Sequence, residues 1–427
     1  MPDIFELMNR FCPDGVPYYR LDQVFDILQG YSPSMDKKEY WEGGTVPFFR
    51  MENLKGDGCK LVASDTDMFC TMDSIRGKPF PGGSLIMATC ATIGVHALVC
   101  EDFLANQRFS VLKPAVFEPK IAGSRLKIAN EPLDMDFANY YAFELDKWCK
   151  DHINEGTFAQ VNMVGFRAFP WPVPPLQVQR EIVAILDKFD MYCNDMTAGL
   201  AGELEMRRKQ YRYWRDKIFQ DLLDEGCEMQ PIKSLGAFDQ ASGIKKDALQ
   251  EDGMPCLHYG QIYTTYDIEF KTPVSYVSDD TYAVSAKARH GDVVVTLAET
   301  ADLGFVGKAV AQVSGVDVAI SMHAGIIRLN PAEMDAKFLA YYMDTYKFWM
   351  QKDRCKVGTS IIGIRVPLWQ KIQVPVPDMA RQLEIVEILD KFRELECELE
   401  HELELRRKQY EYYRDMLLSF PERKENA

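Results

Sequence analysis

Few residues in this sequence are spaced for catalysis or metal binding. Cys149 and His152 are spaced as CxxH, and Cys256 and His258 as CxH, but a structural zinc site needs four ligands and no second pair accompanies either. The sequence has no GxxxxGK[ST] loop, no GxGxxG after a strand-like run, no HExxH and no Asn/Asp-Pro-Pro-aromatic motif of an amino-methyltransferase. These observations predict a protein without catalytic residues, metal ligands or a cofactor of its own.

Basic and polar side chains in loop-like stretches indicate a different chemistry, the binding of duplex DNA. Arg and Lys neutralise phosphates or donate to guanine, and polar loop side chains reach base edges. The N-terminal candidates are Ser32, Lys37, Lys38, Arg50, Lys78, Thr89, Arg108, Thr157 and Arg167. The later candidates are Lys245, Lys246, His258, Tyr259, Lys287, Arg289, Arg354, Lys356, Thr359, Ser360 and Arg365. Each single residue also fits an ordinary surface position, so the clusters carry the prediction.

The overall charge limits what these clusters can mean. The 427 residues include 49 Lys and Arg against 64 Asp and Glu, a net charge of −15, which argues against a broadly basic nucleic-acid coat or a membrane-surface protein. A local basic patch remains compatible with it. Eleven cysteines without a CxxC pair indicate reduced thiols, and the most hydrophobic run, 85–100, is interrupted by polar residues and too short for a membrane span. We therefore expect a cytoplasmic protein without a membrane segment.

The elements that must position these residues follow from an internal repeat. REIVAILDKF at 180–189 recurs as EIVEILDKF at 384–392, and RRKQY at 207–211 recurs at 406–410. The first motif is shifted by 203 residues and the second by 199. The first copy therefore holds four extra residues between the two motifs.

Both copies are predicted to be long helices, over 173–225 and 376–420. Their apolar residues follow the alternating three- and four-residue spacing of a coiled-coil seam, with an additional four-residue step at Leu200 to Leu204 that predicts a stutter. Asp378 suits a helix N-cap, while Gly226 and Pro421 suit helix ends.

The helices separate two globular segments, 1–172 and 226–375. Both contain short Val/Ile-rich strands, for example near 83–90 and 291–297, and one helix each near 134–148 and 333–350. The predicted fold class is mixed α/β, with two globes and two long helices forming a pseudo-two-fold repeat.

The polar positions of the helices recur together with the apolar ones. A seam needs only its apolar positions, so this repetition predicts a partner surface that is met twice. Its candidates are Arg180, Arg207, Arg208, Gln210, Tyr211, Arg406, Arg407, Gln409 and Tyr410. The simpler interpretation is a helical hairpin that only holds the globes apart. The run of alternating Glu residues at 394–404 is either a solvated helix face or a docking face for a basic partner.

These helical motifs, with RRKQYRYWRD and RRKQYEYYRD in full and the order globe, helix, globe, helix, resemble the specificity subunit of type I restriction-modification systems. The resemblance covers essentially the whole chain and implies two target recognition domains at opposite ends of an antiparallel helical pair. Each domain would read one half of a bipartite double-stranded DNA site. The helices would set the spacing and dock two modification (methyltransferase) subunits, which bind S-adenosylmethionine, and restriction (motor-nuclease) subunits would complete the complex.

Two other classes of function remain open at the level of sequence. One is a coiled-coil adaptor whose two globes bind proteins, and the other is a nuclease or methyltransferase with unrecognised motifs. Salt-dependent binding to duplex DNA would separate the first from a DNA reader. The negative net charge also predicts that the isolated chain binds DNA weakly and that the modification subunits contribute much of the DNA affinity of the complex.

Overall fold

The computed structural model describes residues 10–54, 56, 58–114, 133–154, 159–194, 199–241, 244–299, 304–359 and 361–422. The chain divides into two compact units, residues 1–199 with 404–427, and residues 200–403. Each unit thus combines one predicted globe with parts of both predicted helical regions. The predicted boundaries at 172/173, 225/226 and 375/376 separate globes from helices. They differ in kind from the limits of the two compact units, and they stay predictions.

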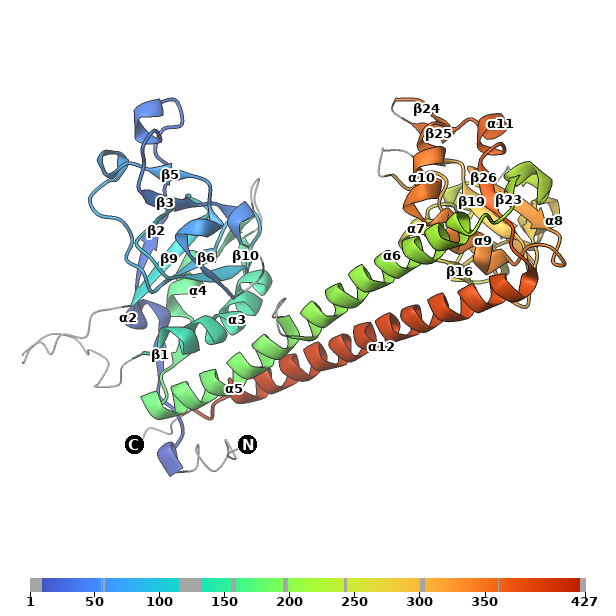
Figure 1. Ribbon diagram of the computed structural model, residues 1–427. Coiled ribbons are helices and arrows are strands. Elements are labelled where there is room, and N and C mark those ends of the chain that lie inside the picture. The colour runs from blue at the N-terminus through green and yellow to red at the C-terminus, as the bar shows by residue number, and fades with distance from the viewer. Residues whose placement is uncertain are drawn as a thin grey trace, which may run out of the picture. The chain divides into compact units, whose positions relative to one another are not determined.

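A five-stranded sheet forms the centre of the first unit (Figure 1). Its order is β2 (Phe25–Gln29), β9 (Phe109–Pro114), β6 (Ser84–Ala88), β7 (His96–Val99) and β4 (Cys59–Leu61), with only β4 and β7 parallel. Successive side chains face opposite sides. Leu85 of β6 packs with helix α3 (Met135–Asp151), while Ile86 packs with a second sheet of β5 (Phe69–Cys70), β3 (Val46–Phe49) and β8 (Leu104–Ala105). Shorter elements are β1 (Tyr18–Arg20), α2 (Leu21–Val24), β10 (Ile153–Asn154), β11 (Gln160–Val161), α4 (Met163–Ala168) and β12 (Pro170–Pro172).

The second unit is built in the same way. Its five-stranded sheet has the order β14 (Gly236–Gln240), β23 (Ala324–Leu329), β19 (Val293–Thr296), β21 (Ala309–Gln312) and β16 (Glu269–Phe270). Its second sheet has the order β17 (Ser275–Val277), β15 (Met254–Leu257), β22 (Val318–Ile320) and β18 (Lys287–Ala288). Further strands are β13 (Met229–Pro231), β20 (Ala298–Glu299), β24 (Lys356–Val357), β25 (Ile362–Ile364) and β26 (Gln373–Pro375). The helices of the globe are α7 (Gln261–Thr264), α8 (Asp279–Val284), α9 (Ala336–Met343), α10 (Tyr346–Asp353) and α11 (Val366–Trp369).

The two globes therefore repeat one topology, and both are mixed α/β as predicted. In chain order, β2, β6, β7 and β9 of the first unit correspond to β14, β19, β21 and β23 of the second. The predicted strands at 83–90 and 291–297 are β6 and β19. The helix predicted over 333–350 is instead divided into α9 and α10, because Thr345 interrupts it and its side chain accepts the N–H of Phe348 as the N-cap of α10.

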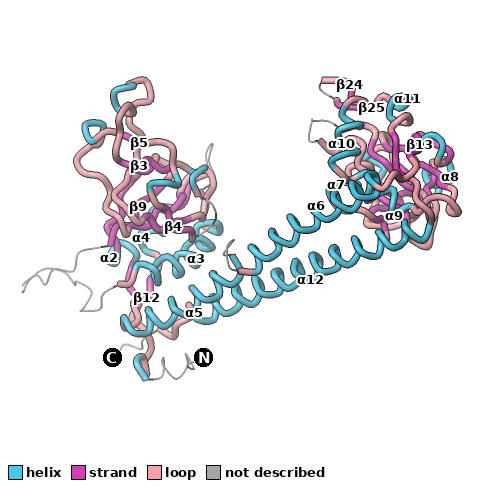
Figure 2. Tube along the Cα trace, in the orientation of Figure 1, coloured by secondary structure: helices cyan, strands magenta, loops and turns pink. Residues whose placement is uncertain are grey.

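The long helices are α5 (Leu176–Asn194), α6 (Leu200–Asp224) and α12 (Met379–Leu417), coloured cyan in Figure 2. The single helix predicted over 173–225 is wrong, because Gly199 is not helical and α6 begins after it. Gly and Thr in 197–202 are poor helix formers. The second helix is continuous, and the Asp378 carboxylate caps it by accepting the N–H of Arg381 at 3.0 Å. Gly226 adopts φ +82 just after α6, as expected for a helix stop.

Each unit contains one antiparallel pair of these helices. In the first unit, Phe189 of α5 stacks on Tyr413 of α12 with 5.4 Å between ring centroids, and Arg406 lies over Tyr192. In the second unit, Arg208 of α6 pairs with Glu400, and Tyr211 shares a core with Leu389. Most of the described apolar residues at the predicted seam spacing are buried, but Trp214, which also fits that spacing, is 42% exposed.

Candidate nucleic-acid interface

The turns at one end of each five-stranded sheet gather many of the predicted DNA-facing residues. This end is where β2 and β6 finish and β9 begins in the first unit, and where β14 and β19 finish and β23 begins in the second. Because the two globes share a topology, equivalent turns supply the residues in both. We call the two groups the first turn cluster (Gln29, Ser32, Arg50, Arg76, Gln107 and Arg108) and the second turn cluster (Lys246, His258, Tyr259 and His323).

In the first turn cluster, side-chain hydrogen bonds hold the turn between β8 and β9. Gln107 accepts a hydrogen bond from the Ser32 hydroxyl at 2.7 Å, and Gln29 donates to the Gln107 carbonyl at 2.7 Å. The Asn106 N–H donates to the Phe49 carbonyl, which places Arg50 beside this turn. Arg108 is exposed at its tip. This arrangement presents an exposed cation from a fixed turn.

Arg76 joins this cluster although the sequence analysis did not single it out. Its backbone N–H donates to the Tyr31 hydroxyl at 2.6 Å, and its guanidinium lies 5.4 Å from the Tyr31 ring centroid. Tyr31 directly precedes the predicted Ser32, and Lys78 lies in the same exposed segment as Arg76. An isolated Arg between Ile75 and Gly77 gave no spacing signal from which this contact could be predicted.

A loop after Ser32 carries the pair Lys37 and Lys38, and both are exposed. Lys37 Nζ donates to the Tyr40 hydroxyl at 3.1 Å and lies 4.8 Å from the Tyr40 ring centroid. The indole N–H of Trp41 donates to the Ser34 carbonyl at 3.1 Å and closes the loop. The loop therefore offers two ammonium groups of the kind that neutralise phosphates.

In the second turn cluster, His258 and Tyr259 directly follow β15. Their ring centroids are 4.5 Å apart, and Tyr259 meets His323 edge to face at 5.4 Å. Burial lowers the pKa of His258, and the positive charges of Lys246 and His323 lower it further. His323, which the sequence analysis omitted, is exposed and adopts φ +70, a conformation uncommon for residues other than Gly.

The strands β24 and β25 place further cations next to this end of the sheet. The Ile364 N–H of β25 donates to the Leu297 carbonyl, directly after β19, and β25 pairs with β20. Arg354, Thr359 and Arg365 are exposed around this pair, whereas Lys356 pairs with Asp353 at 3.2 Å.

The structure does not bring every predicted residue to these turns. The prediction for Thr89 is wrong for another reason: it lies at this end of the sheet, where its N–H donates to the Arg108 carbonyl, but it is 1% exposed and its hydroxyl shares a 3.1 Å hydrogen bond with Ser110, so it cannot reach a base. Arg167 lies on α4 near Asp22 of α2, at the opposite end of the sheet. Arg289 precedes β19 and is also at the opposite end. Lys287 Nζ donates to carbonyls of Ala283 and Ser285. Lys245 is exposed beside Lys246, and Thr157 and Ser360 lie outside the described residues.

The repeated helical motifs contain an internal polar clasp that sequence reading missed. Gln179 of α5 accepts the N–H of Asp134 and donates to the Pro174 carbonyl, both at 2.7 Å. Gln382 of α12 makes the equivalent contacts with Asp335 and Pro377, both at 2.8 Å. Both glutamines are fully buried.

A second pair of contacts completes the clasp. The Tyr140 hydroxyl donates to Asp187 at 2.7 Å, and the Tyr341 hydroxyl donates to Asp390 at 2.6 Å. Part of the repeated polar pattern therefore attaches each globe to its helix. The signal for it was the recurrence, at the shift of 203, of a Gln just before REIVAILDKF and EIVEILDKF and of an Asp within them.

The rest of the repeated face is exposed or half-buried. Arg207 donates to Gln210 at 3.2 Å, and Arg406 donates to Gln409 at 3.0 Å. Arg180, Arg407 and Gln210 are exposed, and Arg208 pairs with Glu400. Tyr211 and Tyr410 differ, being 6% and 9% exposed, so they serve the packing of the helices and leave little surface for a partner.

Large apolar residues recur on the same exposed face. Met206 and Leu405 are 63% and 51% exposed, and Tyr213 and Tyr412 are 61% and 66% exposed. Each pair is related by the shift of 199, and positions seven apart lie on one face of a helix. We call Met206 with Tyr213, and Leu405 with Tyr412, the twin apolar pairs.

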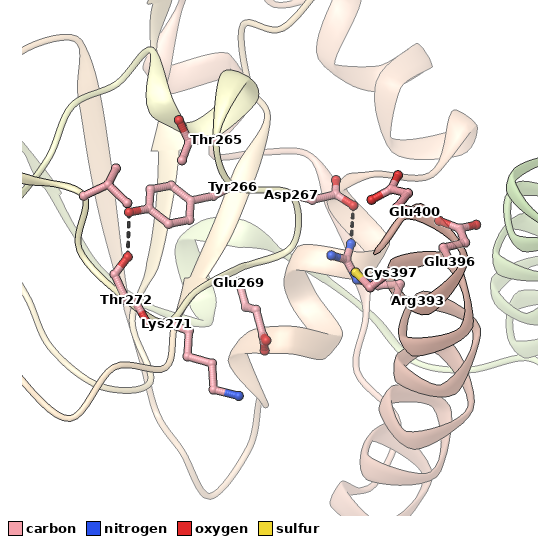
Figure 3. Close-up of a pocket in the computed structure, with 11 residues that line it drawn as sticks. Thr265, Tyr266, Asp267, Glu269, Lys271, Thr272, Arg393, Glu396, Cys397 and Glu400 are labelled. Atoms are coloured by element: carbon pink, nitrogen blue, oxygen red, sulfur yellow. Dashed lines mark hydrogen bonds and ion pairs between the residues drawn. The ribbon is translucent and has the colours of Figure 1, made fainter. Parts of the chain in front are cut away.

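A pocket of about 570 Å³ lies between α12 and the loop before β16 in the second unit (Figure 3). Arg393 donates to Asp267, and Lys308 Nζ is 3.1 Å from the same carboxylate, so the two cations hold the pKa of Asp267 below its usual value although burial raises it. Burial raises the pKa of Glu396, which also lines the pocket. Glu400 is neutralised by Arg208. The Arg393–Asp267 pair joins the globe to α12, and the Arg208–Glu400 pair joins α6 to α12, so part of the Glu run has a role beyond a solvated face.

The described residues have two further properties. They contain no group of three or more His, Cys, Asp or Glu side chains placed to hold a metal ion. None of their helices is both long and apolar enough to cross a membrane.

Comparison with known proteins adds three findings. Residues 13–206 and 276–406 match the family described as the type I restriction modification DNA specificity domain. The chain is 30% identical to the type I restriction enzyme EcoprrI specificity subunit of Escherichia coli, over 89% of this chain and 88% of that protein. It is 28% identical to the EcoR124I/EcoR124II specificity subunit of Escherichia coli, over 58% of this chain and 61% of that protein.

The fold has a solved counterpart. A chain from a structure concerned with complex assembly and conformational transition of the type I R-M system superimposes with a TM-score of 0.61. The match covers 95% of this chain and 97% of that chain at 15% identity. This likeness concerns the fold alone.

Proposed function

Because this chain belongs to the type I restriction modification DNA specificity family, we propose that each globe reads one half of a two-part, asymmetric duplex DNA site through its turn cluster. The observation that carries this proposal is the contrast between shared topology and unlike side chains. The turn that presents Arg108 in the first unit presents His323 in the second, and Arg50 after β3 is replaced by His258 after β15. Unlike side chains on equivalent turns suit unlike half-sites.

Exposed cations and hydrogen-bonded turn side chains have different roles in DNA binding. Exposed cations such as Lys37 and Arg365 contact phosphates and fix the register, which carries no sequence information. Side chains on hydrogen-bonded turns, such as Ser32 and His258, face base edges and supply the specificity. The net charge of −15 opposes binding to the DNA backbone, so the partners of this chain contribute to the DNA affinity of the complex.

The helices dock two copies of one partner, the modification (methyltransferase) subunit, through the twin apolar pairs and the flanking arginines. An exposed apolar residue pair that recurs with its polar surroundings supports two identical contacts. Methyl transfer is then carried out by the modification subunits, and this chain is non-catalytic and acts in the cytoplasm. Restriction (motor-nuclease) subunits join the assembled complex.

The experiment that tests this proposal maps methylated adenines in the source genome before and after deletion of the gene for this chain. The expected result is one asymmetric site of two short parts separated by a fixed gap, lost on deletion. Methylation that survives the deletion, or a site without a gap, would contradict the proposal. Steep salt dependence of binding to duplex DNA would exclude the protein-binding adaptor.

A further inference from the structure

The second turn cluster contains a side chain whose hydrogen-bonding role is fixed by its own backbone. The N–H of Gly260 donates to Nδ1 of His258 at 3.2 Å, so Nδ1 is an acceptor. In a neutral imidazole with Nδ1 accepting, the proton must be on Nε2. Nε2–H of His258 has no partner within the described part of the chain. We infer that His258 reads the second half-site by donating from Nε2 to N7 of a purine in the major groove, an inference that rests on the proposed function.

The segment that carries His258 is held on both sides. The His258 N–H donates to Oε1 of Gln261 at 2.9 Å, and Gln261 in turn donates to the Ser275 hydroxyl at 2.5 Å. The Tyr259 N–H donates to the hydroxyl of Ser321 at 2.8 Å, and Ser321 is fully buried. A reading residue needs such support, because a loosely held donor loses discrimination.

The surroundings of His258 favour a neutral acceptor over a phosphate as its ligand. The ring is half-buried against Tyr259, and burial together with Lys246 and His323 lowers its pKa, so it is neutral at physiological pH. A neutral donor beside a separate cation suits a base edge, while the ammonium group of Lys246 suits a phosphate. Purine N7 is an acceptor common to adenine and guanine, whereas cytosine offers a donor in the major groove; thymine offers the acceptor O4, which the 7-deaza bases in the test below distinguish from N7. We therefore expect a purine at the contacted position.

The test compares three variants of the full chain, each expressed with its modification subunits in cells deleted for the native gene. His258→Phe keeps a flat ring against Tyr259 but removes the donor, and His258→Gln retains a donor of similar reach. The matched control is His290→Gln, a histidine at the opposite end of β19 that is bonded to the Ser314 carbonyl. Methylated adenines are mapped in each strain.

The expected result is that His258→Phe relaxes the preference for a purine at one position of one half-site, while the other half-site and the gap are unchanged. His258→Gln should retain the preference in part, and His290→Gln should retain it fully. In vitro, 7-deazaguanine or 7-deazaadenine at that position should weaken binding of the wild-type complex about tenfold and leave the His258→Phe complex unaffected.

Three outcomes would overturn the inference. One is a uniform loss of binding with a reduced salt slope and unchanged base preferences, which indicates a phosphate contact. Another is an unchanged methylation map in His258→Phe. The third is equal binding to normal and 7-deaza DNA by the wild type. All three leave the two-part site intact, so they are distinguishable from failure of the proposed function, in which no such site depends on this chain.

Discussion

The buried glutamines Gln179 and Gln382 make the same contacts in the two units. Each side chain accepts an N–H from the N-cap residue of a globe helix and donates to the carbonyl of a proline that precedes its own helix. A buried amide with all these partners satisfies several backbone groups at once, and removing it leaves each without a bond. The clasp therefore fixes the angle at which each globe meets its helix.

Replacing Gln382 with Leu should lower the free energy of unfolding of the second unit by about 2–3 kcal/mol, because the Asp335 N–H and the Pro377 carbonyl lose their partner. Urea titration monitored by tryptophan fluorescence measures this change. Gln210→Leu is the matched control, since Gln210 is exposed, and it should change stability by less than about 0.5 kcal/mol. Equal effects of the two substitutions would argue against the clasp.

Lys352 provides a test that depends on pH. It is fully buried, its Nζ donates to the Gly304 carbonyl at 3.1 Å, and burial lowers its pKa to about 8. Between pH 8 and the pKa of the unfolded chain, the unfolded state binds the proton and the folded state does not, so stability rises with pH. Relative to Lys352→Met, the wild type should gain about 2 kcal/mol in free energy of unfolding between pH 7.5 and 9.5. The exposed neighbour Lys347→Met should show no such difference, and a gain of zero for Lys352 would contradict the prediction.

Among the elements, the helices illustrate what sequence reading can and cannot provide. The repeat, the apolar spacing and the caps at Asp378 and Gly226 were predictable, because each depends on contacts within a few residues. The break at Gly199 was not, since a four-residue insertion fits a helical stutter as well as an interruption. The shift of 199 already relates Leu200 to Leu399, so the four extra residues lie before α6 and not within it.

Deleting residues 195–198 brings the first repeat to the length of the second. The deletion changes the separation of the two repeated motifs by no more than a four-residue length of helix, about 6 Å, so we expect the gap between half-sites to shorten by at most about two base pairs, with both half-sites unchanged. Replacement of the same four residues by alanines keeps the length and should keep the gap. Methylation mapping of both variants checks this, and an unchanged gap after the deletion would argue against the proposal that the helices set the gap.

The twin apolar pairs predict a separation between assembly and reading. Met206→Ser with Tyr213→Ser should weaken binding of a modification subunit by about tenfold or more, since two large exposed apolar side chains are lost from the contact. The methylated sequence should not change. Val284→Ser, on the globe and 86% exposed, is the control for simple loss of surface hydrophobicity. Affinity is measured by titration with purified modification subunit, and wild-type affinity of the double variant would contradict the docking role.

At the scale of the whole molecule, one topology is used twice with different turn residues. The fold class was predictable because short Val/Ile-rich runs between turn residues specify buried strands, such as β6 and β19. The membership of the turn clusters was not, since it depends on pairings between strands far apart in sequence. Thr89 looked like an accessible loop hydroxyl and is buried against Ser110, whereas His323 gave no signal until β22 and β23 placed it beside Tyr259.

The most direct test of the account is a map of methylated adenines from strains in which residues 1–172 are exchanged for the corresponding globe of a relative with a known site. The account predicts that one half of the two-part site changes to the donor's half, while the other half stays the same. A map in which both halves change, or neither does, would contradict the claim that each globe reads its own half.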